Sequence, residues 1–191
     1  MLSEKALTEL VKRIEAGCKE KETFTAAIDG RCASGKTSLA EKLSEIIDCN
    51  VIHTDDFYLQ KNQRTEKRLS EPGGNLDRER LLKEVLIPLR EGREVSYRPF
   101  VCSCMDFGEE VTLPRKKLWI IEGSYSCHPD LREHYDLTVF VTTDKETQKK
   151  RILSRNGEEK LQAFLSRWIP LEERYFEKLD IFGKADITIK T

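Results

Sequence analysis

Residues 30–37 read Gly-Arg-Cys-Ala-Ser-Gly-Lys-Thr and fit the phosphate-loop pattern G-x4-G-K-[ST] without deviation. In such a loop the glycines let the backbone wrap around phosphate groups. Successive N–H groups and the N-terminus of the following helix then point at the anion. The pattern places Lys36 on the β- and γ-phosphates and Thr37 on Mg²⁺. A strand-like run enters the loop and an amphipathic helix leaves it, which is the context that the motif requires.

A second set of reactive side chains lies at 53–58, where the chain reads His-Thr-Asp-Asp-Phe-Tyr directly after another strand-like run. Ligands of an open parallel sheet bind beyond the carboxyl ends of its strands, so these acids are expected near the transferred phosphate. One carboxylate, of Asp55 or of Asp56, could accept the proton of an attacking hydroxyl. The alternative is an acidic cap on a helix that follows. We interpret His53 as a packing residue at the strand end.

Two further segments carry charges that suit the same chemistry. The apolar run 118–121 ends in Glu122, and a carboxylate at that place could organise Mg²⁺ or its waters. Arg151 and Arg155 are four residues apart on a predicted helix and therefore share one face. Cations there could neutralise charge that develops on a phosphoryl group. The alternative for these arginines is a solvated basic face.

The elements that must position these residues alternate along the chain. Helical periodicity covers 3–16, 39–47, 81–89, 144–156 and 158–180, and strand-like runs cover 24–29, 51–54, 118–121, 137–141 and 185–190. Residues 59–74 are predicted to form a long loop, and 94–113 a β-hairpin with its turn at 106–108. Pro170 should kink or interrupt the last helix. The alternation predicts right-handed βαβ units, and therefore an α/β fold with helices on both faces of a parallel sheet.

Length and charge exclude several classes of protein. The 191 residues favour one domain, 1–191, with the hairpin as a small insertion. Lys and Arg number 33 against 34 Asp and Glu, and this balance argues against a nucleic-acid partner. No apolar run approaches the roughly 20 residues that span a bilayer, so no membrane partner is expected. The first 20 residues mix charged and apolar side chains and do not form a signal peptide.

The six cysteines are scattered along the chain, and we expect free thiols in a reducing cytoplasm. A zinc site built from Cys102, Cys104, Cys127 and His128 is the alternative. Neither half of that set has the usual spacing of zinc ligands.

The phosphate loop, the Asp-Asp-Phe-Tyr element, the Ile-Ile-Glu-Gly strand end and the Arg-x3-Arg helix occur in this order along the chain. Together they resemble the uridine kinase branch of the phosphoribulokinase/uridine kinase family of P-loop kinases. The resemblance runs from about residue 24 to the last predicted strand. It implies a P-loop NTPase three-layer fold with a five-stranded parallel sheet in the order 2-3-1-4-5.

The resemblance also implies roles for individual residues. Asp55 would be the catalytic base, assisted by Lys36, Arg151 and Arg155, and the two arginines would open a short lid, 151–160. Thr37 and Glu122 would hold Mg²⁺. The substrate would contact Asp55, Tyr58, Asp77 and Phe100. The phosphates of ATP would lie on Gly30, Arg31, Cys32, Ala33, Ser34, Gly35, Lys36, Thr37 and Ser38.

The chain departs from the family pattern around the predicted acceptor site. Arg78 and Glu79 follow Asp77 where the family has His-Pro. The hairpin carries Phe100 where uridine kinases tend to have a tyrosine that packs on the nucleobase, and the neighbouring acid is absent. The family's residues for phosphoryl transfer can therefore be assigned to this sequence more directly than its nucleoside-binding residues.

The sequence thus predicts a cytoplasmic enzyme that uses ATP and Mg²⁺ to phosphorylate a hydroxyl of a small, nucleoside-like metabolite. The 5′-hydroxyl of uridine or cytidine is the first candidate acceptor. Another ribosyl compound or a pantothenate-like alcohol is the alternative within enzymes. A nucleotide-binding regulator without turnover is the alternative outside them. A second copy of the chain is left open as a partner.

Overall fold

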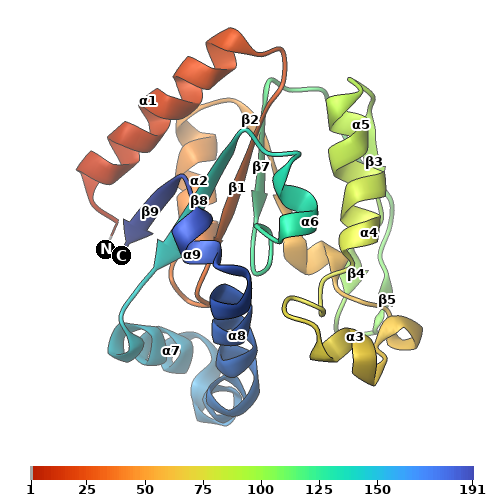
Figure 1. Cartoon of the computed structure of the whole chain (residues 1–191), viewed down its shortest axis with the longest axis vertical. Coiled ribbons are helices and arrows are strands. Elements are labelled where there is room, and N and C mark those ends of the chain that lie inside the picture. Colours follow the sequence, from red (N-terminus) through yellow and green to blue (C-terminus); the bar gives the residue numbers. More distant parts are fainter. Residues whose placement is uncertain (1) are drawn as a thin grey trace.

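A central parallel sheet organises the computed structural model, which describes residues 2–191 (Figure 1). Its strands lie in the order β2-β7-β1-β8-β9. Numbered by their order in the chain, these five strands have the order 2-3-1-4-5, which confirms the predicted fold. Their bounds are β1 (Phe24–Gly30), β2 (Cys49–His53), β7 (Leu118–Glu122), β8 (Leu137–Thr142) and β9 (Ile187–Lys190).

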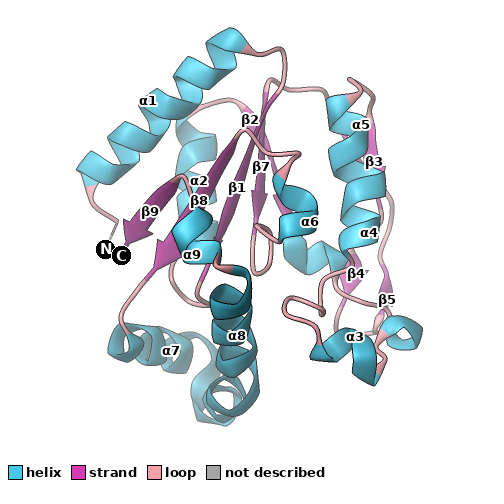
Figure 2. Ribbon diagram, viewed as in Figure 1, coloured by secondary structure: helices cyan, strands magenta, loops and turns pink. Residues whose placement is uncertain are grey.

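Helices cover both faces of the sheet and complete three layers (Figure 2). One face packs against α1 (Glu4–Glu20) and α2 (Lys36–Ile46), whose apolar side chains join one buried cluster. The opposite face packs against a second cluster that draws on five short or medium helices. These are α4 (Arg78–Leu81), α5 (Ile87–Arg90), α6 (Pro129–Arg132), α8 (Ile169–Leu179) and α9 (Ile181–Lys184).

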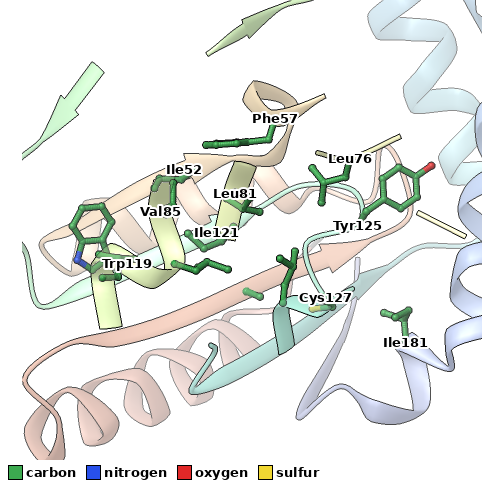
Figure 3. Close-up of a cluster of buried hydrophobic side chains, with 14 of the residues drawn as sticks. Ile52, Phe57, Leu76, Leu81, Val85, Trp119, Ile121, Tyr125, Cys127 and Ile181 are labelled. Carbon is green, nitrogen blue, oxygen red and sulfur yellow. The ribbon is translucent and has the colours of Figure 1, made fainter. Parts of the chain in front are cut away.

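The second cluster shows why the central strands are continuous apolar runs (Figure 3). Ile52 and Ile121 project from neighbouring strands onto Leu81 and Val85, and all four side chains are fully buried. Burying a side chain of this size contributes about 1.5–3 kcal/mol each. Every residue of β1 and β7 is buried, as expected for strands that are covered on both faces.

The strand register brings the candidate residues to one edge of the sheet. Glu122, at the end of β7, lies opposite His53 of β2 and opposite Ile28 of β1. The phosphate loop leaves β1 two residues after Ile28. The carboxyl ends of three adjacent strands therefore meet beside this loop, as they do at ligand sites of open α/β sheets.

Two connecting segments differ from their predictions. The predicted loop 59–74 contains a 3₁₀ turn (Lys61–Gln63) and the short helix α3 (Glu66–Ser70), whose first turn is capped by the Thr65 hydroxyl. The excursion 94–113 is built from β3 (Val95–Tyr97), β4 (Phe100–Val101), β5 (Asp106–Phe107) and β6 (Val111–Leu113). Its turn lies at 102–105 and not at 106–108, because Phe107 pairs with Phe100.

The C-terminal helical region is interrupted where the sequence predicted. Helix α7 (Lys145–Ala163) contains Gly157 at φ 80°, ψ 172°, which breaks its helical geometry. A π-helical turn (Phe164–Trp168) separates α7 from α8, and Pro170 lies in the first turn of α8. Proline has no N–H to donate and tolerates a first turn, which accounts for the break. Within residues 2–191, no helix combines the length and the apolar character that a membrane span requires.

Candidate active site

The phosphate loop joins β1 to α2 and depends on glycine at both of its ends. Gly30 has φ 137°, and a side-chain carbon at this position would lie 1.9 Å from the carbonyl oxygen of Val141. Gly35 has φ 94°, and a side-chain carbon there would meet no atom within 4 Å. The first glycine is thus required by close packing of the backbone. The second leaves open space in front of the helix N-terminus, where a phosphate chain can approach.

Lys36 and Thr37 occupy the positions that a bound phosphate chain needs. The Lys36 ammonium group donates to the carbonyl oxygens of Gly30 (2.8 Å) and Arg31 (3.0 Å), so the side chain lies across the loop. The Thr37 hydroxyl lies 3.2 and 3.4 Å from the two carboxylate oxygens of Glu122. A hydroxyl beside a carboxylate at a phosphate site suits Mg²⁺, which binds one or two carboxylates together with phosphate oxygens and waters.

Glu122 also contacts His53, and this contact corrects the interpretation of His53 as a packing residue. The Nδ1 atom of His53 lies 2.5 Å from a carboxylate oxygen of Glu122, and the His53 side chain is half exposed. The hydrogen bond to Glu122 raises the pKa of His53 above its ordinary value, and burial acts in the opposite direction. Periodicity could not reveal this pair, because it forms across two neighbouring strands.

Asp55 and Asp56 lie in one 3₁₀ turn (Thr54–Phe57) but face different surroundings. Asp55 is exposed to the cavity, and the hydroxyl of Tyr58 donates to its Oδ1 atom at 2.8 Å. Burial and the adjacent Asp55 carboxylate raise the pKa of Tyr58, which therefore stays a hydrogen-bond donor. Asp56 instead accepts a hydrogen bond from the Tyr97 hydroxyl at 3.0 Å, and burial raises its pKa. Asp55 is thus the acid that the fold presents to the cavity.

Arg151 and Arg155 both face the same cavity from α7. The Arg151 guanidinium donates to the carbonyl oxygen of Ala33 in the phosphate loop at 3.1 Å and to the Thr191 hydroxyl at 2.9 Å. Arg155 donates to the side chain of Asn156 at 2.9 Å. Arg151 therefore contacts the phosphate loop, whereas Arg155 is exposed and lines the cavity without a hydrogen bond to the loop.

One cavity of about 770 Å³ unites most of the predicted residues. This volume lies within the usual range for small-molecule sites. The predicted residues that line it are Cys32, Ala33, Ser34, Gly35, Lys36, Thr37, Ser38, Asp55, Tyr58, Glu122, Arg151 and Arg155.

Asp77 and Phe100 do not line this cavity. The buried Asp77 carboxylate accepts from the Arg80 backbone N–H at 3.0 Å, which caps α4, and from the Gln63 side chain at 2.7 Å. Phe100 is 4% exposed and packs edge-on against Phe107. Both side chains thus support the elements around the cavity without facing it. From the excursion, Cys102 and Met105 reach the cavity instead.

The structure also places the six cysteines. All are unpaired, with Cys102 and Cys104 exposed on the excursion and Cys127 buried. No group of three His, Cys, Asp or Glu side chains within residues 2–191 is arranged to hold a metal ion.

A buried carboxylate that sequence patterns did not single out lies beneath the phosphate loop. Asp29 is fully buried and accepts hydrogen bonds from the backbone N–H of Cys127 (2.9 Å) and from the hydroxyl of Tyr175 (2.8 Å). It also accepts from the N–H groups of Gly30 and Tyr125. Burial raises the pKa of Asp29. The sequence feature that could have identified Asp29 is its position as an acid at the end of an apolar strand, directly before the loop.

Glu172 is a second carboxylate that the sequence did not indicate. Only 4% of it is exposed, and it lines the cavity from α8. One oxygen accepts from the backbone N–H of Cys32 at 2.9 Å, and the other accepts from the Ser124 hydroxyl at 2.8 Å. The adjacent Glu173 holds the Arg31 guanidinium through two contacts of 2.6 and 2.8 Å. Helix α8 is therefore fastened to the phosphate loop by two consecutive acids.

A phosphate loop at the carboxyl edge of a five-stranded parallel sheet, with a carboxylate and two arginines in the same cavity, is the architecture of a P-loop protein. The sequence profile described as the Phosphoribulokinase / Uridine kinase family matches residues 25–161. The match covers well over half of the chain. The chain belongs to this family.

Individual relatives agree with that assignment. Uridine-cytidine kinase-like 1 of Mus musculus is 29% identical over 164 residues, which cover 76% of this chain and 28% of the mouse protein. The chain thus spans little more than a quarter of that relative. Uridine-cytidine kinase 2-B of Danio rerio is 24% identical over 204 residues, which cover 95% of this chain and 78% of the fish protein.

The solved structures agree in fold. A structure from Bacillus stearothermophilus described as a possible uridine kinase superposes with a TM-score of 0.68 at 23% identity, covering 94% of this chain and 98% of that one. At this identity the likeness concerns the fold alone.

Proposed function

We propose that this protein transfers the γ-phosphoryl group of ATP, in the presence of Mg²⁺, to a hydroxyl of a small metabolite. The observation that carries the proposal is that the phosphate loop and the Asp55–Tyr58 pair line one cavity. A donor nucleotide on the loop and a hydroxyl beside Asp55 would then meet in the same space. Family membership supports the same class of reaction.

In this proposal Asp55 accepts the proton of the acceptor hydroxyl. The hydroxyl oxygen forms a bond to the γ-phosphorus, while the bond from that phosphorus to the β,γ-bridging oxygen breaks. The products are ADP and a phosphate monoester. Tyr58 orients Asp55, because its hydroxyl donates to one carboxylate oxygen and leaves the other oxygen for the acceptor.

The remaining residues of the cavity stabilise charge. Bound Mg²⁺, held by Thr37 and Glu122, supplies neutralisation of the phosphate oxygens. Lys36 lies across the loop, and Arg151 and Arg155 add two cations from α7. We propose that residues 151–160 act as a short lid, since Gly157 interrupts the helical geometry of α7 within this segment.

For the acceptor, the 5′-hydroxyl of uridine or cytidine is the first candidate, supported by the names of the related proteins. One observation favours a different acceptor. Phe100, the residue expected to replace the ring that packs on a nucleobase, is turned away from the cavity toward Phe107. Another ribosyl compound or a pantothenate-like alcohol is therefore the second candidate.

The proposal is tested with radiolabelled ATP, Mg²⁺ and a panel of nucleosides, sugars and alcohols. The expected result is a labelled phosphate ester formed from at least one acceptor, together with ADP. Binding of a non-hydrolysable ATP analogue without transfer to any acceptor would favour a nucleotide-binding regulator and contradict the proposal. A variant at an exposed carboxylate of the excursion, Asp106→Asn, serves as the control that should keep full activity.

A further inference from the structure

The cavity has a cation that the nucleotide machinery does not use. Arg64 lines the cavity from the segment that follows the 3₁₀ turn Lys61–Gln63. Lys36 and Arg151, by contrast, donate directly to carbonyl oxygens of the phosphate loop. Arg64 shares this cavity with Asp55 and with the Cys102 thiol of the excursion. Burial and Asp55 raise the pKa of this thiol, and Arg64 lowers it.

Arg64 has no counter-ion among residues 2–191, although the neighbouring arginines do. Arg68 pairs with Glu79 at 2.7 Å, Arg78 with Asp130 at 3.1 Å, and Arg80 with Glu84 at 3.2 Å. The Arg64 side chain is half-buried and forms neither an ion pair nor a hydrogen bond with the described residues. A guanidinium that faces a cavity without an ion pair or a hydrogen bond is complementary to an anion with two oxygens, such as a carboxylate or a phosphate, which it can bind through two hydrogen bonds.

The backbone that carries Arg64 is held in place. The backbone N–H of Gln60 donates to the Gln63 side-chain oxygen at 2.8 Å, and the Gln63 amide group donates to the buried Asp77 at 2.7 Å. Asp77 in turn caps α4. Arg64 therefore starts from an anchored position beside the cavity, and this lowers the entropy that a bound ligand must remove.

The excursion contributes no aromatic ring to the cavity that Arg64 lines. From the excursion, the two side chains that reach the cavity are a thiol and a thioether, Cys102 and Met105. Neither offers a ring for stacking or the paired donors and acceptors that read a base edge. The cavity thus brings together the Asp55 carboxylate, the unpaired Arg64 guanidinium and these two sulfur-containing side chains, while its aromatic rings come from Tyr58, Tyr125, Phe164 and Trp168.

We propose that the phosphoryl acceptor is a small hydroxy compound that bears a carboxylate or phosphate group, and that Arg64 binds this group while the hydroxyl lies beside Asp55. The inference rests on the proposed kinase function and names its substrate class. Arg64 then determines specificity: it selects charged acceptors over neutral ones and does not take part in the transfer itself.

The test compares acceptors that differ only in charge: glycerol, glycerate and glycerol 3-phosphate, and pantothenol against pantothenate, with uridine as the neutral nucleoside. ADP release is measured for wild type, Arg64→Gln and Lys61→Gln. The last variant removes a charge from the same segment but at an exposed residue outside the cavity. Comparing glycerate with glycerol 3-phosphate distinguishes a carboxylate acceptor from a phosphorylated one.

In the wild type we expect kcat/KM to be at least about 10-fold higher for the charged member of a pair, equal to about 1.4 kcal/mol. In Arg64→Gln this ratio should collapse toward one, chiefly through KM, and in Lys61→Gln it should persist. Efficient turnover of uridine with no preference for charge would overturn this inference and leave the kinase function standing. Transfer to none of the acceptors would count against the kinase function.

A binding measurement tests the role of Arg64 independently of turnover. With a non-hydrolysable ATP analogue and Mg²⁺ present, glycerate or glycerol 3-phosphate should raise the Tm of the wild type and of Lys61→Gln. The same anions should raise the Tm of Arg64→Gln much less. Equal stabilisation of all three proteins, or none of the wild type, would overturn the role of Arg64.

Discussion

The carboxylate of Glu172 accepts a hydrogen bond from the backbone N–H of Cys32, so that a buried acid of α8 directly holds the phosphate loop. Its second oxygen accepts from the Ser124 hydroxyl, and the carbonyl of Ser124 accepts from the Thr54 hydroxyl at 3.0 Å. Thr54 precedes Asp55. One chain of contacts therefore runs from the phosphate loop through α8 and the end of β7 to the turn that carries the proposed base.

This chain predicts different outcomes for two substitutions of Glu172. Glu172→Gln keeps an acceptor for the Cys32 N–H and can still pair with the Ser124 hydroxyl, so activity should stay within about 10-fold of wild type. Glu172→Ala leaves both donors unpaired and should cost about 1–3 kcal/mol of unfolding free energy. Its kcat should fall more than its affinity for an ATP analogue.

Urea unfolding, steady-state kinetics and titration with the analogue measure these effects, with the exposed Glu177→Ala on the same helix as control. If Glu172→Gln lost as much activity as Glu172→Ala, Glu172 would act through its charge and not through position.

Replacing Asp55 separates binding from transfer. Asp55→Asn removes the proposed proton acceptor but leaves the phosphate loop intact, so the ATP analogue should bind with unchanged affinity while turnover drops by about 10² or more. Steady-state kinetics with the best acceptor and isothermal titration with the analogue check this pair of effects. Unchanged turnover in Asp55→Asn would show that another group accepts the proton.

His53 should make stability depend on pH through its contact with Glu122. The hydrogen bond raises the pKa of His53, so the folded state binds this proton more tightly than the unfolded state does. Its contribution is therefore complete below the unfolded value of about 6.5 and is lost as pH rises through the folded pKa. The Tm difference between wild type and His53→Gln should be largest near pH 5.5 and shrink above neutrality. A difference that grew with pH would contradict the assignment.

His128 should make stability depend on pH in the opposite direction from His53. Burial and the nearby Arg78 guanidinium lower the pKa of His128 to about 4, and its Nδ1 atom accepts from the Asp130 backbone N–H. The unfolded state therefore binds this proton more readily between about pH 6.5 and 4. Stability contributed by the neutral imidazole should be present above pH 6.5 and be lost as pH falls toward 4. His128→Asn should flatten this part of the Tm profile, and an unaltered acidic slope would refute it.

Substitutions of Asp77 distinguish a structural role of this residue from a role in binding the acceptor. Asp77→Ala removes the cap of α4 and the partner of Gln63, and should cost about 1–2 kcal/mol of unfolding free energy. Asp77→Asn keeps an oxygen for the cap, so its Tm and its KM for the acceptor should both stay close to wild type. A large rise in that KM in Asp77→Asn without a change in Tm would support the sequence-based prediction that Asp77 binds the acceptor.

Local sequence patterns determined the architecture and located the phosphate loop. The strands at 24–30 and 118–122 are buried on both faces, so each appears in the sequence as a largely continuous apolar run that predicts a strand. The phosphate loop is a contiguous segment, and its glycines and its lysine act on the backbone of the loop itself. Lys36, Thr37 and Asp55 could be found from sequence because each belongs to one short motif between a strand and a helix.

Only the tertiary structure decided which side chains complete the cavity. Asp55 and Asp56 are adjacent in sequence, and Tyr58 and Tyr97 direct them to different sides. Glu172 reaches the phosphate loop across 140 positions of the chain. Arg64 lines the cavity, and the preceding residue, Gln63, is hydrogen-bonded to Asp77. The contacts of Gln63, Tyr97 and Glu172 join segments that lie 14 or more positions apart in the sequence. Such contacts leave no periodic pattern in the sequence, so only the tertiary structure reveals them.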